Sequence, residues 1–230
     1  MPIMLQRLPT PEGVPAQIEL WQIAFDLDHG DDAKDALVLS PQEQAHARRY
    51  RRRDDARRFC CMRACLRRLL GERLDCAPQA VPLVRNAYGK PLLGGPGGLS
   101  FNVSHAGYIG LLAMAPGLAL GIDVECGIAA GLQELHGMAR QVLSPDEWAA
   151  LPAPLDEVRF LRHWVAKEAV LKALGLGIGE HLQSIHLDLE SHPRYQIFHQ
   201  QSQWPAPARL HARALSTRPG HAAALAWIDA

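Results

Sequence analysis

The chain has 230 residues, 48% hydrophobic and 21% charged, enough for one large or two small domains with sizeable cores, which excludes wholesale disorder. Its 24 basic and 24 acidic residues balance, so the net charge does not indicate a polyanionic partner. No apolar run approaches the roughly 20 residues of a membrane span, and the N-terminus lacks the apolar core of a signal peptide. The five cysteines show no C-x-x-C pair and no zinc spacing, so we expect reduced thiols in a cytoplasmic protein.

The first half of the chain contains several strand patterns. Short apolar runs bounded by turn residues predict the strands, and a polar turn over residues 26–34 follows the first of them. The Gly-rich connection over residues 94–98 is not a phosphate loop, because no GK[ST] follows it. Strands are expected over residues 17–25, 81–85, 100–103, 109–115 and 118–125.

One long helical region interrupts these strands. It opens on a capping-box pattern, with Ser40 as N-cap, Pro41 at the first position and Glu43 at the third. Apolar residues at helical spacing continue to Gly71, the expected stop, with a break near residues 53–54.

Arginine is crowded in this helical region between Arg48 and Arg73. The simplest interpretation is a solvated face, with Asp54 and Asp55 compensating the charge. Two alternatives stay open: contact with nucleic-acid phosphates, and a small-molecule phosphate site formed by arginine forks with Lys90.

The second half predicts helices first and strands last. Helices are expected over residues 132–142, from Ser144 onward, and over residues 155–175. Strands are expected over residues 184–189, 194–199, 208–215 and 221–228. Each half thus combines a basic helix with a set of strands, and Pro116–Gly117 forms a natural seam. The simplest arrangement is an α+β pair of subdomains with this seam as the cleft.

The helix over residues 160–175 carries an unusual carboxylate. Phe160 and Trp164 belong to its apolar stripe, and Glu168 falls inside that stripe. A carboxylate facing a core needs a cation, a donor or a proton, because an isolated buried charge is very costly. The alternative is an exposed i,i+4 pair between Glu168 and Lys172.

A second acidic pair lies in the sequence Gly-Ile-Asp-Val-Glu. On a strand, Asp123 and Glu125 point to the same face and repel each other unless a cation lies between them. Oxygen ligands suit a hard metal, and an incomplete protein shell completed by substrate phosphates suits Mg²⁺. A solvated strand end is the alternative, but Glu168 adds a third carboxylate and favours the metal.

The polar end of the strand over residues 100–103 contains Ser104 and His105. Adjacent strand residues point to opposite faces, so the two do not form a hydrolase dyad, and the G-x-S-x-G pattern is absent. This strand end would suit a phosphate or a base, although a lone histidine of this kind is more often structural.

Several of these motifs occur in the order found in one family. The chain resembles the 4′-phosphopantetheinyl transferases of the longer, pseudo-dimeric Sfp type, in the subset that has W-x-x-K-E-A. The resemblance covers most of the chain, and its specificity comes from the order and spacing of motifs that are each weak alone. The motifs are the L-S-x-x-E helix from Leu39 to Phe59, GKP at 89–91, FNVSH at 101–105, GIDVE at 121–125 and WVAKEAVLK at 164–172.

The resemblance implies two similar α/β subdomains, residues 1–116 and 117–230, related by an approximate twofold, with the active site in the cleft between them. The enzyme would move the phosphopantetheine arm of coenzyme A onto a serine of an apo acyl or peptidyl carrier protein. Asp123, Glu125 and Glu168 would bind Mg²⁺, or Mn²⁺.

The resemblance also assigns roles to single residues. Glu168 would take the serine proton, directly or through a water. Lys172 would stabilise the leaving phosphate and Lys167 would hold the phosphates. Arg58 and Arg53 match positions that grip the 3′-phosphate of coenzyme A. The remaining nucleotide-binding matches are Lys90, Ser104 and His105.

The family's partners would be coenzyme A and carrier proteins, with no nucleic acid, no membrane and a monomeric state. The chain departs from the family pattern at Val142–Leu143, which replaces an aromatic residue, and in the last forty residues, which carry no family motif. Two other hypotheses remain: another Mg²⁺-dependent transferase acting on a nucleotide diphosphate, and a nucleic-acid binder. The neutral charge and the lack of an aromatic stacking platform count against the second.

Overall fold

The computed structural model describes residues 4–28, 32–95, 98–127, 132–151, 155–177, 179, 181–189 and 193–229. The helices are α1 (Asp32–Ala36), α2 (Pro41–Ala47), α3 (Arg53–Leu74), α4 (Leu132–Val142), α5 (Pro145–Ala150) and α6 (Glu157–Leu174), with short 3-10 turns at Pro78–Ala80, Leu182–Ser184 and Pro207–Arg209. The strands are β1 (Met4–Leu8), β2 (Glu19–Ala24), β3 (Leu83–Arg85), β4 (Pro91–Leu93), β5 (Leu99–Ala106), β6 (Ile109–Pro116), β7 (Ala119–Cys126), β8 (His186–Asp188), β9 (Arg194–Phe198), β10 (Leu210–Ala214) and β11 (His221–Ile228).

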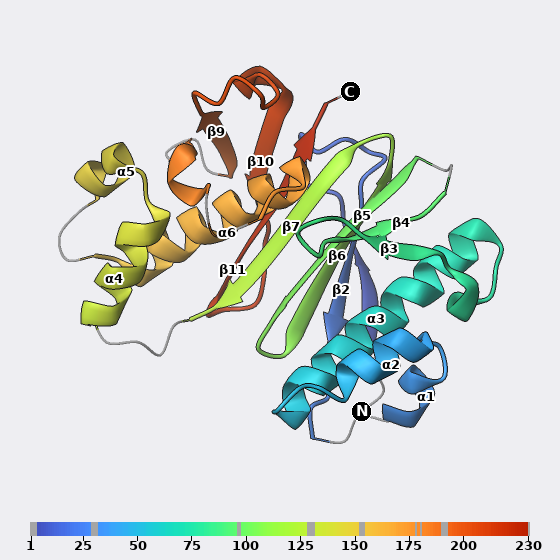
Figure 1. Ribbon diagram of the computed structural model, residues 1–230. Coiled ribbons are helices and arrows are strands. Elements are labelled where there is room, and N and C mark those ends of the chain that lie inside the picture. The colour runs from blue at the N-terminus through green and yellow to red at the C-terminus, as the bar shows by residue number, and fades with distance from the viewer. Residues whose placement is uncertain are drawn as a thin grey trace.

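Two antiparallel sheets organise the molecule (Figure 1). The first has the order β1-β2-β6-β5, and the second has the order β7-β11-β10-β9-β8. Strands β3 and β4 form a separate two-stranded ribbon. The long helix α3 covers the first sheet and α6 covers the second, so the layers follow the order helix, sheet, sheet, helix.

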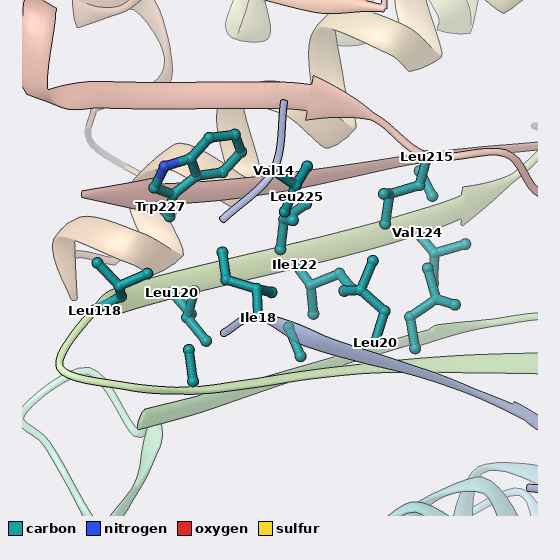
Figure 2. Packing of buried hydrophobic residues seen from close by; sticks show 14 of the residues in the cluster. Val14, Ile18, Leu20, Leu118, Leu120, Ile122, Val124, Leu215, Leu225 and Trp227 are labelled. Carbon is teal, nitrogen blue, oxygen red and sulfur yellow. The ribbon is translucent and has the colours of Figure 1, made fainter. Parts of the chain in front are cut away.

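The two sheets share one apolar core. Alternate residues of β6 and β7 point between the sheets, and Figure 2 shows Leu120, Ile122 and Val124 packed toward Ile18 and Leu20. The residues between them point to the outer faces, because strand side chains alternate with period two. Burial of one face of each strand thus fixes which residues of β7 can meet α6.

Two glycines let the long helices lie close to the sheets. A Cβ at Gly110 of β6 would lie 2.2 Å from Met62 Sδ of α3. A Cβ at Gly121 of β7 would lie 1.9 Å from the Ala169 carbonyl oxygen of α6. Each half therefore has the same plan, an antiparallel sheet with one long helix packed against it at a glycine.

The expected fold class is confirmed: a mixed α/β structure with two subdomains. The capping box at Ser40 and Glu43 is present, with Ser40 N donating to Glu43 Oε2 at 2.8 Å. Two boundaries differ from expectation. Helix α1 begins inside the expected polar turn, and α3 continues through Gly71 to Leu74, with Asp75 as its C-cap at a φ of 50°.

Only some arginines of α3, such as Arg53 and Arg73, lie on the expected solvated face. Arg57, Arg63 and Arg67 are buried. Glu43 lies between two of them, 3.3 Å from Arg63 Nε and 2.6 Å from Arg67 Nε. Arg57 donates to the Leu27 carbonyl. Helix α2 covers this side of α3 and supplies the buried carboxylate, which the sequence pattern of α3 alone does not show.

The structure also bears on the cysteines, the Gly-rich connection and the question of membrane spans. All five cysteines lie in the described part of the chain, and none of them forms a disulfide. Within the Gly-rich connection, residues 96–97 lie outside the described residues. Of the helices described, none is both long and apolar enough to cross a bilayer.

Candidate active site

Strand β7 and helix α6 bring three carboxylates together. Asp123 and Glu125 lie on the face of β7 that α6 covers, and Gly121 on the same face lets the helix approach. Glu168 faces them from α6, and one oxygen from each of the three residues lies within 4.8 Å of the others. The predicted carboxylate set therefore converges at one place.

The electrostatics of this cluster are those of a site built for a cation. Burial, followed by repulsion from Asp123, raises the pKa of Glu168 to about 7, and burial also raises the pKa of Glu125 to about 7. The Lys172 ammonium group lies 2.5 Å from Asp123 Oδ1 and 3.5 Å from Glu168 Oε2. Burial lowers the pKa of Lys172, but these two carboxylates outweigh burial and raise it. One lysine thus offsets only part of the negative charge.

Hydrogen bonds orient two of the carboxylates, and one carboxylate oxygen receives no hydrogen bond from the described residues. Ser104 Oγ donates to Asp123 Oδ1 at 2.8 Å, and Trp164 Nε1 donates to Glu168 Oε1 at 2.5 Å. Asp123 Oδ2 is buried and has no hydrogen-bond partner among the described residues. Buried polar atoms are rarely left without a partner. An oxygen-only set with such an atom fits a hard divalent cation.

Lys167 does not belong to this cluster, contrary to expectation. Its side chain is fully buried, and its ammonium group lies 2.6 Å from Glu147 Oε2. It also donates to the carbonyl oxygens of Val142 and Leu182, at 2.8 and 3.0 Å. All three partners lie behind α6, so Lys167 anchors this helix and is not available to hold phosphates.

Lys90 also departs from its expected role. Its ammonium group donates to the Leu120 carbonyl at 2.9 Å and to the Lys172 carbonyl at 2.5 Å. Burial, with a smaller effect of the Lys172 charge, lowers the pKa of Lys90 to about 8. The side chain is directed at backbone oxygens of β7 and α6, which takes two of its three donors away from any nucleotide.

Arg58 and His105 lie beside the carboxylate end of β7. Arg58 Nε donates to the Gly107 carbonyl at 2.7 Å, in the turn between β5 and β6. A Cβ at Gly107 would lie 3.9 Å from Cys126 Sγ, next to Glu125 in sequence. His105 is exposed in the same hairpin.

Arg53 lies elsewhere. It is exposed in the first turn of α3 and lines a cavity of about 320 Å³ between α1, α2 and α3, together with Leu39 and Cys60. A larger basic cavity, of about 650 Å³, lies between α2, α3 and β3. Arg49 and Arg85 line it, and the three carboxylates do not.

Two residues that support the site were not predicted. Trp164 was expected only to pack, yet it precedes Glu168 by four residues, and this spacing on a helix indicates contact. Asn102 is buried, and its Oδ1 accepts from Ile122 N at 2.8 Å. Nothing in the sequence of β5 indicates that contact, because it joins strands of different sheets.

Comparisons of the sequence with known proteins point to one family. The sequence model of the 4′-phosphopantetheinyl transferase superfamily matches residues 119–226, and that of the 4′-phosphopantetheinyl transferase N-terminal region matches residues 31–117. The chain is 34% identical over 179 residues to the 4′-phosphopantetheinyl transferase HetI of Nostoc sp., covering 75% of this chain and 74% of that protein. It is 34% identical over 197 residues to a phosphopantetheinyl transferase of Thraustochytrium sp., covering 77% and 68%. The chain is therefore a transferase that belongs to the 4′-phosphopantetheinyl transferase superfamily.

Proposed function

We propose that this protein transfers the 4′-phosphopantetheine arm of coenzyme A to a serine of an apo carrier protein and releases adenosine 3′,5′-bisphosphate. The observation that carries the proposal is the cluster of Asp123, Glu125 and Glu168 beside the Lys172 ammonium group. These carboxylates would hold Mg²⁺, with Mn²⁺ as the alternative. When bound, the ion would neutralise charge on the pyrophosphate.

The chain's own residues would act on the two reacting ends. The serine oxygen bonds to the phosphorus that carries the pantetheine arm, and the bond from that phosphorus to the bridging pyrophosphate oxygen breaks. Glu168 takes the serine proton, directly or through a water. A carboxylate held within reach of the serine hydroxyl, or of a water between them, suits this task. Lys172 stabilises the charge that develops on the leaving phosphate, because it is an adjacent, largely desolvated cation.

The nucleotide end of coenzyme A would lie along the hairpin between β5 and β6. Arg58 donates to a carbonyl oxygen of that hairpin, and His105 belongs to the hairpin, close to the end of β7. In this arrangement residues 1–116 supply the nucleotide contacts, and residues 117–230 supply the metal ligands and Glu168. The WVAKEAVLK motif favours the Sfp type of the family and its subset with W-x-x-K-E-A. The protein would act as a cytoplasmic monomer without nucleic acid.

Transfer to a carrier protein tests the function directly. Purified protein is incubated with coenzyme A, Mg²⁺ and several apo carrier proteins from fatty-acid, polyketide and non-ribosomal peptide pathways. We expect a mass gain of one phosphopantetheine on a single serine, and none when Mg²⁺ is chelated. No modification of any carrier, with the protein folded and Mg²⁺ bound, contradicts the proposal.

Arg58 can be tested with two substrates. Arg58→Ala removes a cation, so we expect it to raise KM for coenzyme A about tenfold while leaving KM for 3′-dephospho-coenzyme A unchanged, since a charged hydrogen bond contributes about 1.5–3 kcal/mol. Arg53→Ala should have a smaller effect, because Arg53 lines a different cavity. If Arg49→Ala gives the selective loss instead, the nucleotide lies in the larger basic cavity and the assignment to Arg58 is wrong.

A further inference from the structure

Strand β7 is the outer strand of the second sheet, and its free edge faces the first sheet. Its other edge pairs with β11 along its whole length. In an antiparallel strand the N–H and C=O of one residue point to the same edge, and successive residues alternate. The backbone groups of Leu120, Ile122 and Val124 therefore point to the free edge, which must be paired, covered or solvated.

Side chains, not a strand, cover this edge. From one end to the other, Lys90 donates to Leu120 O, Asn102 accepts from Ile122 N, and Lys172 donates to Ile122 O at 3.4 Å. Ser104 Oγ lies 3.4 Å from Val124 N at the far end. Three of these four side chains come from the first half of the chain, so the N-terminal half holds the strand that carries Asp123 and Glu125.

Lys90 does more than cover the edge, because its second bond reaches α6. The same ammonium group that contacts Leu120 O of β7 also contacts Lys172 O in the last turn of the helix. Asn86 reinforces this contact: its Nδ2 donates to Gly175 O at 3.0 Å, and its Oδ1 accepts from Lys90 N at 2.9 Å. The turn between β3 and β4 thus binds the C-terminal end of α6 at the carbonyl oxygens of Lys172 and Gly175. The last carbonyls of a helix lack the usual donor four residues further on, and among the described residues Lys172 O otherwise accepts only from the capping Gly175 N, at 3.2 Å.

We propose that Lys90 is a positioning residue that fixes the last turn of α6 against the free edge of β7 and so sets the place of the Lys172 side chain beside Asp123. The inference rests on the proposed function for its kinetic consequences, but the structural role can be measured without any substrate. In this role Lys90 binds the backbone of α6 at Lys172, and not the nucleotide as first expected.

Hydrogen exchange of the folded protein tests this role, with Lys90→Met as the variant. In the last turn, Gly175 N donates to Lys172 O and Leu176 N donates to Leu171 O. Losing the charged partner should make these two amides exchange at least about tenfold faster, while amides in the middle of α6 keep their rates. The matched control is Lys34→Met, which makes the same chemical change at an exposed lysine of α1. Lys90→Arg keeps the charge and can still donate to both carbonyl oxygens, so it should restore protection to within about threefold.

The kinetics separate positioning from substrate contact. Lys90→Met should lower kcat at least about tenfold and leave KM for coenzyme A within about twofold, because the group that moves is Lys172 and not a nucleotide contact. Raised KM with unchanged kcat and unchanged exchange would overturn the proposal and return Lys90 to the nucleotide.

Should Lys90→Met fail to fold, Asn86→Asp carries the exchange test, since it keeps the acceptor for Lys90 N and loses the donor to Gly175 O; unchanged exchange in that variant would overturn the proposal. If the wild type modifies no carrier protein, the proposed function fails, whereas the exchange result still decides whether Lys90 fixes α6 to β7.

Discussion

At the scale of single residues, the three carboxylates of the site repel one another, and a bound cation would reduce this repulsion. Asp123, Glu125 and Glu168 come within 4.8 Å of one another, and two of them have a pKa raised to about 7. Lys172 offsets part of this charge from one side. The remaining repulsion between the carboxylates lowers the stability of the metal-free fold.

Isosteric amides test the carboxylates. Asp123→Asn and Glu168→Gln should each lower the rate of transfer by more than about 100-fold, a larger loss than removal of an outer-shell partner of a metal causes. The fold should stay intact, because each change reduces repulsion in the cluster. Transfer assays with circular dichroism as the folding control measure this. A variant with full activity would remove that residue from the metal set.

The pH dependence of stability and of Mg²⁺ binding follows from Glu125 and Glu168. The folded pKa of about 7 exceeds the unfolded value of about 4.3, so between these values the metal-free protein binds more protons folded than unfolded. Its free energy of unfolding should therefore fall as pH rises through this window and level off above pH 7. Mg²⁺ needs both groups deprotonated, so its affinity should rise by up to about tenfold per pH unit for each proton displaced.

Melting temperatures with chelator and with Mg²⁺ from pH 5 to pH 9 check this prediction. The gap between the two curves should widen up to about pH 7. In Glu125→Gln the metal-free curve should be flatter, since one of the titrating groups is gone. A gap that does not change with pH contradicts the assignment.

At the scale of elements, the site depends on how closely α6 lies on β7. Gly121 allows that approach, because any Cβ there would overlap the Ala169 carbonyl oxygen at 1.9 Å. Behind the helix, Lys167 and Glu147 form a buried pair that also joins α5 and β8, through Leu187 N and Glu147 Oε1 at 2.7 Å. The close approach at Gly121 positions the face of α6 that lies on β7. The Lys167–Glu147 pair positions the opposite face.

Gly121→Ala should push α6 away from β7. We expect a loss of stability of at least about 1–3 kcal/mol, the usual cost of overpacking, together with weaker Mg²⁺ binding as Glu168 moves from Asp123. Gly137→Ala in α4 is the matched control, because nothing lies within 4 Å of the added Cβ. That change should be neutral or stabilising by up to about 1 kcal/mol. Denaturant unfolding and calorimetric Mg²⁺ titration decide the outcome, and equal effects of the two variants would contradict the close-approach argument.

Lys167→Met should destabilise the fold by about 3–5 kcal/mol, because it leaves the Glu147 carboxylate buried without its cation. Adding Glu147→Gln in the same chain should recover part of the loss. Unfolding by denaturant measures both variants. A stable Lys167→Met protein with raised KM for coenzyme A would instead support the phosphate contact first expected of this lysine.

At the scale of the whole molecule, the two halves share the core between their sheets. Leu111 of β6 and Leu225 of β11 are buried in the same cluster, which draws residues from both sheets. Neither sheet could bury its inner face alone, so the halves should unfold together. The free edge of β7 adds polar contacts across the same seam.

Leu111→Ala tests this sharing. It should cost about 2–5 kcal/mol, as for other buried leucines, and lower the midpoint of a single transition. Circular dichroism and tryptophan fluorescence should report the same midpoint, since Trp21 lies in the first half and Trp227 in the second. Two separate transitions would show that the halves fold independently.

The sequence by itself determined the local elements and the acidic set. Period-two alternation placed Asp123 and Glu125 on one face, the capping box at Ser40 placed the start of α2, and helical periodicity put Glu168 in an apolar stripe. These features depend on residues close in the chain, and local geometry links them directly to a face or an end.

Only the tertiary structure decided where the basic side chains go. Lys167, Lys90 and Arg67 each looked available for a phosphate, yet each is bound to oxygens of a distant element. A long cationic side chain can turn to either side of its element, and which side holds a buried acceptor depends on what packs there. That packing comes from α5, β7 and α2, so no local pattern could reveal it.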